Sequence, residues 1–285
     1  MSVHAEAPAR RVPGPAALSG DWRRFFNLTM TLALTDWKLR FFGSALGYVW
    51  SLLRPLLLFG ILYLVFSQIV KIGEAVPNYP LVLLIGVVLF AYFAEVTGDC
   101  VSCVVDRESL VRKVSFPRMV VPLSVAVSSS FNLALNLIVV AIFVVISGVE
   151  PRLSWLLLPI PILLLVVLAT GVGMLLAALY VTLRDIGPIW DVIAQGLFYA
   201  TPVFFPIEFV LDNFSQTAGR LAMANPLATI ITETRYLLIG PELTSASEAI
   251  GGGARLLIPV ALIFFLSVLG FWVFNRTAPR VAEAL

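Results

Sequence analysis

The sequence predicts an all-α integral membrane protein with six transmembrane helices. Of its 285 residues, 60% are hydrophobic and only 13% are charged, against about a quarter charged in soluble globular chains. The mean hydropathy is +0.98. Crossing a hydrocarbon core of about 30 Å takes about 20 apolar residues of helix. Runs of this kind are expected at residues 46–70, 79–104, 122–146, 155–179, 189–205 and 256–274.

Two segments precede the first run, and neither is expected to cross. Residues 1–20 are rich in Ala, Pro and Arg and lack an apolar stretch, so they predict a disordered cytoplasmic tail. Residues 21–42 mix aromatic and aliphatic side chains with basic ones. A basic amphipathic stretch before a span is typical of a helix that lies in the membrane interface.

The distribution of basic residues predicts the orientation, because loops on the cytoplasmic side carry the excess of Lys and Arg. With the amino terminus inside, the inner side holds Arg10, Arg11, Arg23, Arg24, Lys38, Arg40, Arg107, Arg112, Lys113, Arg118, Arg184, Arg276 and Arg280. The outer side then holds Lys71, Arg152, Arg220, Arg235 and Arg255. Both termini, including residues 276–285, are therefore expected in the cytoplasm.

Within the transmembrane domain, residues 46–275, the outer region 206–255 does not fit a simple span. It contains apolar pieces at 218–227 and 230–239 that are too short to cross, separated by prolines and a glycine triplet. Such pieces beside a span indicate re-entrant or outer-leaflet helices.

Several chemistries lack their residues. The sequence has no G-x-x-x-x-G-K-S/T phosphate loop, so ATP hydrolysis by that route is excluded. His4 is the only histidine and lies in the tail, and Cys100 and Cys103 are the only cysteines, so neither a catalytic triad nor a four-ligand zinc site is expected. The two cysteines are interpreted as packing residues rather than a redox pair. Neither an enzyme activity nor a cofactor is expected in this chain.

Three charged features of the apolar runs allow alternative interpretations. Glu95 and Asp99 lie four residues apart in the second run, which indicates either a proton relay or, as the favoured reading, structural partners for Arg107 or Arg112. Arg54 in the first run either snorkels to the inner headgroups, which is favoured, or meets an anionic group such as a lipid diphosphate.

The loop 106–118 (DRESLVRKVSFPR) is the densest charge cluster. It indicates either a docking surface for a soluble partner or a solvated loop that follows the positive-inside rule. Aromatic residues recur on the first, second and fifth runs. They suit either a sugar path or helix packing, since aromatic faces pack against the C–H faces of sugars.

The chain resembles the permease subunits of polysaccharide-exporting ABC transporters, which export O-antigens, teichoic acids, capsules and galactan. The resemblance runs from Trp22 onward. It rests on TDWKLRFFGSALGYVWSLLRPLLLFGILYLVFSQI, YPLVLLIGVVLFAYFAE, ESLVRKVSFPRMVVPLS, LYVTLRDIGPIWDVIAQGLFYATPVFFP, NPLATIITETRYLLIG and FNRTAPRVAEAL. Where many relatives read R-Y-R, this chain has Arg40-Phe41-Phe42, which leaves an arginine role at position 42 unsupported.

The resemblance implies a homodimer in the bacterial inner membrane, with two copies of a separate ABC ATPase that bind the ATP and Mg. The ATPase would dock on Asp106, Arg107, Glu108, Arg112, Lys113, Phe116 and Arg118. The translocation path would be lined by Trp50, Phe59, Tyr63, Phe66, Phe198 and Tyr199. Arg40 and Arg54 would meet the lipid diphosphate.

The expected function is therefore ATP-driven export of a polyprenyl-diphosphate-linked polysaccharide, with membrane lipids as further partners and no nucleic acid. One alternative is an ABC permease for a drug or simple lipid. A less favoured one is a proton-coupled carrier that uses Glu95 and Asp99. A membrane glycosyltransferase would need a loop with paired carboxylates and a nucleotide site, and the sequence shows neither.

Overall fold

The computed structural model describes residues 22–40, 42, 47–71, 76–107 and 117–284, and the predicted tail 1–20 lies outside this part. Every regular element among the described residues is helical, as predicted. In chain order the elements are α1 (Trp22–Arg40), α2 (Val49–Tyr63), a π-helical turn (Leu64–Ile69), α3 (Tyr79–Asp106), α5 (Val120–Ile146), a 3-10 turn (Leu153–Leu157), α6 (Pro159–Thr182), α7 (Ile186–Ala200), α8 (Ile207–Asn213), α9 (Gln216–Ala224), α10 (Pro226–Ile239), α11 (Ala246–Ala249), a 3-10 turn (Gly253–Leu256) and α12 (Leu257–Ala284).

Five helical segments are long and apolar enough to cross a membrane, and they confirm the first four predicted runs and the sixth. They are Val49–Ile69, Tyr79–Asp106, Val120–Ile146, Leu153–Thr182 and Gly253–Thr277.

The fifth predicted run differs from its expected length. It forms α7, whose 15 residues would span only about 22 Å. The helix ends at Ala200 because Thr201 is extended, the conformation favoured before a proline such as Pro202. The sixth crossing therefore stays a prediction.

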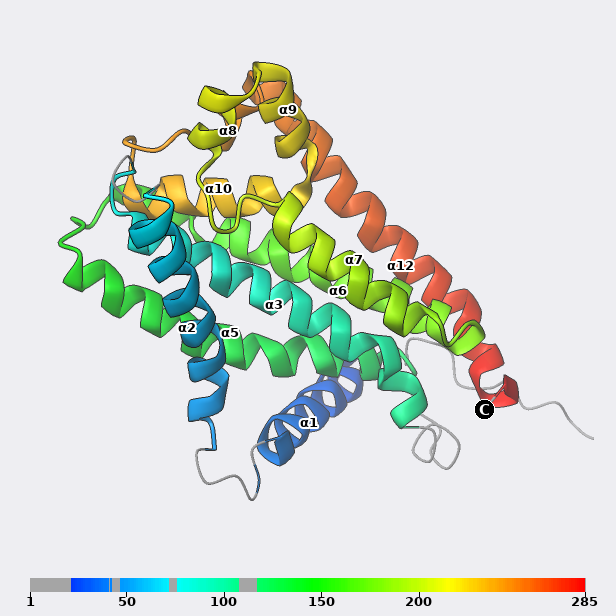
Figure 1. The fold of residues 1–285 in the computed structure, drawn as a ribbon. Helices are drawn as coiled ribbons and strands as arrows, with labels where there is room; N and C mark the ends of the chain where they lie inside the picture. The colour runs from blue at the N-terminus through cyan, green and yellow to red at the C-terminus, as the bar shows by residue number, and fades with distance from the viewer. Residues whose placement is uncertain (1–21, 41, 43–46, 72–75, 108–116, 285) are drawn as a thin grey trace, which may run out of the picture.

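Helix α3 is the axis of the bundle. It contacts α2, α5, α6, α7 and α10, which surround it in Figure 1. In an apolar 18-residue stretch of α3, 78% of the residues are buried. In the corresponding stretch of Val49–Ile69, which comprises α2 and the π-helical turn, only 6% are buried. A helix that is apolar all round suits such a central place, whereas α2 lies at the periphery and faces outward.

Small residues bring α6 and α12 close together. A side chain on Gly270 would overlap the backbone carbonyl of Gly171, and one on Gly171 would overlap Ser267. The Ser267 hydroxyl donates across the interface to the Val167 carbonyl at 3.1 Å. Close backbone approach of this kind gives the packing that holds helices together in lipid.

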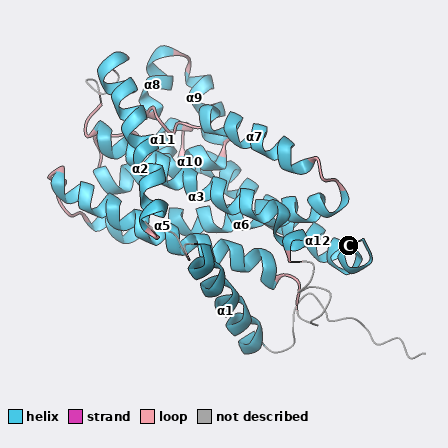
Figure 2. Ribbon diagram, turned by 60° about the horizontal axis from the view of Figure 1, so that its bottom comes forward, coloured by secondary structure: helices cyan, strands magenta, loops and turns pink. Residues whose placement is uncertain are grey.

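The two ends of the bundle carry different elements (Figures 1 and 2). Helix α1 and the C-terminus lie toward one end, and the short helices α8 to α10 gather at the other. The predicted outer region 206–255 thus folds into short helices, while their depth in the bilayer stays a prediction.

Arg235 joins this second end to α3. It is 3% exposed, and its guanidinium donates to the carbonyls of Val82 at 2.8 Å, Pro202 at 2.7 Å and Val203 at 2.6 Å. Burial lowers the pKa of Arg235 to about 9, so the side chain stays charged at neutral pH. The turn after α7 is fixed by this arginine, which the sequence analysis assigned only to the basic residues of the outer side.

Candidate functional site

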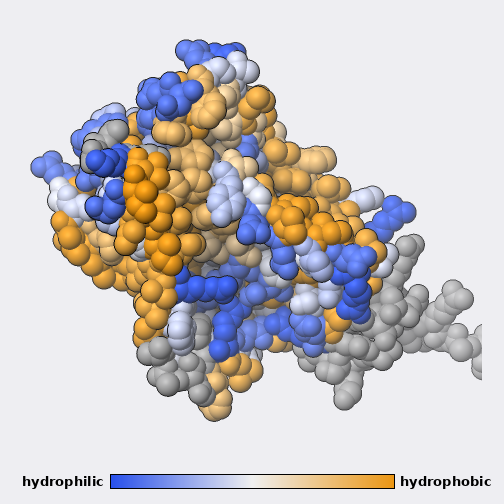
Figure 3. Space-filling model, viewed as in Figure 1, coloured by the Kyte–Doolittle hydropathy of each residue, from blue (hydrophilic) through white to orange (hydrophobic). Residues whose placement is uncertain are grey.

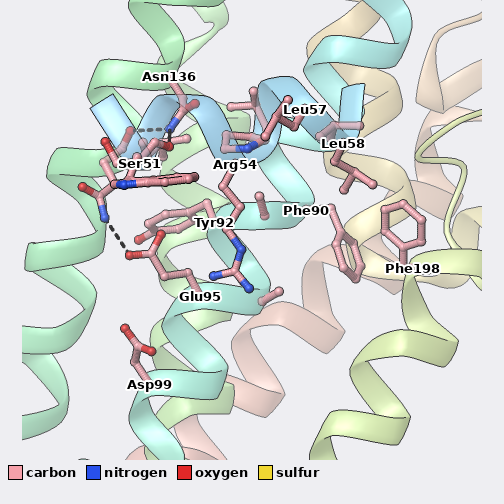
Figure 4. Close-up of a pocket in the computed structure, with 18 of the residues that line it drawn as sticks. Ser51, Arg54, Leu57, Leu58, Phe90, Tyr92, Glu95, Asp99, Asn136 and Phe198 are labelled. Atoms are coloured by element: carbon pink, nitrogen blue, oxygen red, sulfur yellow. Dashed lines mark hydrogen bonds between the residues drawn. The ribbon is translucent and has the colours of Figure 1, made fainter. Parts of the chain in front are cut away.

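A cavity of about 1000 Å³ lies between α2, α3 and α5, with Arg40 of α1 and Phe198 of α7 among its lining residues. Figure 4 shows part of the lining. Much of the wall is apolar, and its charged, amide and hydroxyl-bearing side chains are Arg40, Ser51, Arg54, Tyr92, Glu95, Asp99, Asn132 and Asn136. In Figure 3 hydrophilic residues gather between the apolar surface of α2 and α1. The cavity thus brings together both arginines and both carboxylates that the sequence singled out.

Glu95 and Asp99 share one partner, and it is Arg40. The guanidinium pairs with Glu95 through Nη1 and with Asp99 through Nη2. Partial burial would lower the pKa of Arg40, but the two carboxylates outweigh it, so the net pKa is raised above its usual value. The structure therefore supports a structural pairing of the carboxylates with Arg40, whereas the expected Arg107 pairs with Asp36 and the expected Arg112 lies outside the described residues.

Glu95 is also bound from α5. Its Oε1 accepts from the Asn132 amide at 2.7 Å and from the Ser129 hydroxyl at 3.1 Å. The Trp37 indole of α1 donates in turn to Asn132 Oδ1 at 2.9 Å. This network fastens the last turn of α1 to α3 and α5 at the edge of the cavity.

Arg54 differs from Arg40 because it forms no ion pair with any described carboxylate. It extends from α2 into the cavity, and its guanidinium ends to one side of Glu95 in Figure 4. The four charged side chains of the cavity balance formally, yet only Arg54 has its positive charge unpaired. An anionic group in the cavity would therefore be drawn first to Arg54.

Of the six aromatic residues expected on the path, Trp50 and Phe198 line the cavity. Phe198 also belongs, together with Phe66 and Tyr199, to a chain of rings. Its ring centroids lie as follows: Phe90–Phe198 at 5.1 Å, Phe198–Tyr199 at 5.3 Å, Phe198–Phe204 at 6.0 Å, Phe204–Phe66 at 4.7 Å, Phe204–Phe205 at 5.0 Å and Phe205–Phe209 at 6.2 Å. This chain connects the cavity to α8 at the far end of the bundle.

Phe59 and Tyr63 lie apart from that chain. They stack on each other along α2 at 5.8 Å, and Phe59 also meets Phe143 of α5 edge-on at 5.7 Å. Neither residue lines the cavity.

Only the ends of the predicted docking loop are described. Glu108, Arg112, Lys113 and Phe116 lie outside the described residues. Asp106 accepts from the Ser102 hydroxyl at 2.6 Å, and Arg107 pairs with Asp36 of α1 at 2.5 Å. Partial burial lowers the pKa of Arg118.

The sequence analysis missed Asn132 and Asn136 as site residues, and Trp37 as their neighbour. A signal was present, since the two asparagines lie four residues apart in an apolar run, the same spacing as Glu95 and Asp99. Residues at this spacing share one face of a helix. Two polar pairs in neighbouring runs could have indicated facing surfaces.

A family model for the ABC-2 type transporter matches residues 27–239, three quarters of the chain. This chain belongs to the ABC-2 type transporter family. It is therefore a multi-pass membrane protein and the permease subunit of an ABC transporter. Membership of this family implies an ABC ATPase as its partner.

Named relatives align along nearly the whole chain. An O-antigen export system permease protein RfbA of Klebsiella pneumoniae is 28% identical over 264 residues, covering 91% of this chain and 95% of the relative. The protein of the same name from Myxococcus xanthus is 29% identical over 267 residues, covering 92% and 96%. The similarity to these relatives thus covers more of the chain than the match to the family model does.

Proposed function

We propose that this permease exports a polyprenyl-diphosphate-linked polysaccharide across the bacterial inner membrane, as part of a homodimer that carries two ABC ATPases. The names and full-length alignment of the relatives support a polysaccharide as cargo. The proposal also includes six membrane crossings, with α7 as the fifth, and both termini in the cytoplasm.

The unpaired charge of Arg54 in the cavity is the observation that carries the proposal. A guanidinium binds phosphate oxygens through two parallel N–H donors, and a cavity-lining guanidinium that forms no ion pair with a described carboxylate has these donors free for an anionic ligand. Arg40 is already paired with Glu95 and Asp99, so Arg54 is the main donor to a phosphate in this cavity. A lipid diphosphate would bring its headgroup here while its tail stays among the lipid chains.

The ring chain from Phe90 to Phe209 supports the polysaccharide part of the proposal. Aromatic faces can bind successive sugars through their C–H faces without requiring one fixed register. The ATPase would act at the loop 106–118, and ATP binding would move the helical bundles as near-rigid bodies.

The competing functions are less well supported. A proton-coupled carrier would need Glu95 and Asp99 free to exchange protons, whereas both are ion-paired with Arg40. The full-length relatives are named O-antigen export permeases, which favours a polysaccharide over a drug or simple lipid as cargo.

Replacing Arg54 by Gln tests the proposal. We expect surface polysaccharide to fall about ten- to hundredfold, because a hydrogen bond to a charged group contributes about 1.5–3 kcal/mol. Lipid-linked polysaccharide should accumulate on the inner side. Arg54→Lys should be intermediate, since Lys keeps the charge but not the planar pair of donors.

Arg220→Gln, at an exposed arginine of α9, is the matched control and should export normally. Normal export by Arg54→Gln, with the protein present at wild-type level, would contradict the role of the cavity.

A further inference from the structure

The cavity presents oxygen atoms that accept no hydrogen bond from any described residue. All three bonds to Glu95 end on Oε1, and the bond to Asp99 ends on Oδ2. The Asn136 amide donates from Nδ2 to the carbonyls of Ser51 and Asn132. Oε2 of Glu95, Oδ1 of Asp99 and Oδ1 of Asn136 therefore remain available as acceptors.

These acceptors are held in place. Glu95 is bound by Arg40, Asn132 and Ser129, and its neighbour Asp99 is bound by the same arginine. In Figure 4 the Glu95 and Asp99 carboxylates lie one below the other on one side of α3, with Asn136 above them. A ligand would meet a preformed row of acceptors, because the internal hydrogen bonds already fix the side chains.

The chemistry of this row complements hydroxyl groups and opposes phosphate. Each free oxygen can accept a hydrogen bond from an O–H donor. The same carboxylates repel a second anion, whereas hydroxyl donors on a ligand would pair with their free oxygens. The cavity therefore has a cationic part at Arg54 and an acceptor part at Glu95, Asp99 and Asn136.

We infer that Glu95, Asp99 and Asn136 form a hydroxyl-binding subsite for the first sugar of the lipid-linked glycan, next to the phosphate at Arg54. This inference rests on the proposed function and deepens it. The subsite would distinguish a carrier lipid loaded with sugar from the bare carrier. The bare carrier has no sugar hydroxyls to donate. Its terminal phosphate would lie next to two carboxylates, which repel it.

Binding to the complete complex with its ATPase, in nanodiscs of neutral phosphatidylcholine, tests the subsite. The two probes are farnesyl diphosphate and the same lipid capped by N-acetylglucosamine. We expect the wild type to bind the capped probe at least about tenfold more tightly. In Glu95→Gln/Asp99→Asn the capped probe should bind more weakly and the bare probe more tightly, bringing the two affinities within about twofold.

Two further variants keep the result interpretable. Asp99→Asn alone alters the carboxylate with a single hydrogen bond and should shift the preference in the same direction if the double variant does not fold. Glu150→Gln, at an exposed carboxylate beyond the far end of α5, should leave the preference for the capped probe unchanged.

The outcomes separate the two claims. Phosphatidylglycerol serves as the control anionic lipid. If the wild type binds neither probe more tightly than it binds phosphatidylglycerol, the proposed diphosphate site is wrong. If it binds both probes without preferring the capped one, or if the variants keep the wild-type preference, the hydroxyl-binding subsite alone is wrong.

Discussion

Arg40 and Arg235 carry the same charge in different surroundings. Arg40 meets two carboxylates at the edge of a cavity, whereas Arg235 is buried and donates to backbone carbonyls. A buried guanidinium bound only by carbonyls keeps its charge and fixes the segments that supply them. Arg235 therefore acts as a structural clamp, and Arg40 as part of the site.

The sequence could identify Glu95 and Asp99 as a pair on one helical face, because that spacing is local. It could not identify their partner, since Arg40 lies 55 residues before Glu95 and reaches it only through the packing of α1. The burial of Arg235 could not be predicted either, because its partners are also distant in the sequence. Its carbonyl partners include Val82, which is 153 residues away.

The Arg235 clamp also explains why position 86 is glycine. A side chain there would overlap the Val203 carbonyl and the Arg235 guanidinium. Gly86→Ala should lower the free energy of unfolding by about 1–3 kcal/mol, the usual cost of overpacking. Thermal unfolding in one fixed detergent measures this.

Gly98 of the same helix supplies the control, because nothing lies within 4 Å of the place its side chain would take. Gly98→Ala should raise stability by about 0.5–1 kcal/mol through helix propensity alone. A destabilisation of equal size by both substitutions would contradict the close packing at Gly86.

At the scale of elements, α1 joins two regions of the molecule through one turn. Asp36 pairs with Arg107, where the predicted docking loop begins, while Trp37 and Arg40 bind the network at the cavity. Amphipathicity predicted the helix itself, and its buried residues Phe25, Thr29 and Ala33 follow a four-residue repeat. The bridging contacts were not predictable, because they depend on where the helix docks.

A charge exchange tests whether α1 couples the two regions. Asp36→Arg or Arg107→Asp alone should reduce substrate-stimulated ATPase activity of the complex about two- to fivefold, as expected for a partly exposed ion pair. Combining both should restore much of it, because the pair is rebuilt in reverse. Asp185→Asn, at an exposed site, should have no effect. A double variant as impaired as the sum of its singles would exclude the pair as the coupling contact.

For the whole molecule, apolar run length predicted five crossing segments well, since length and hydropathy decide which helices span a bilayer. The end of α7 was placed five residues too late, although Pro202 and Pro206 were visible signals. Whether this 15-residue helix crosses decides if α8 to α10 face the outside.

Cysteine labelling tests the crossing by α7. With Cys100 and Cys103 replaced by Ser, a cysteine at Asp212 should react with an impermeant maleimide in intact cells. A cysteine at Asp185 should react only after permeabilisation, since it would face the cytoplasm. Both positions are exposed, so buried geometry does not confound the comparison. Labelling of both from the same side would show that α7 does not cross.

The outward position of α2 has a consequence for how the cavity can be studied. Pro55 is the only buried residue of this helix, although α2 supplies one wall of the cavity. Lipid chains, or a second subunit, must therefore set much of its position, because the chain's own packing constrains it little. The width of the cavity therefore depends on the surrounding lipid or detergent as well as on the protein. Affinities measured in detergents of different chain length should differ from one another, and the bilayer value is the one to compare with export.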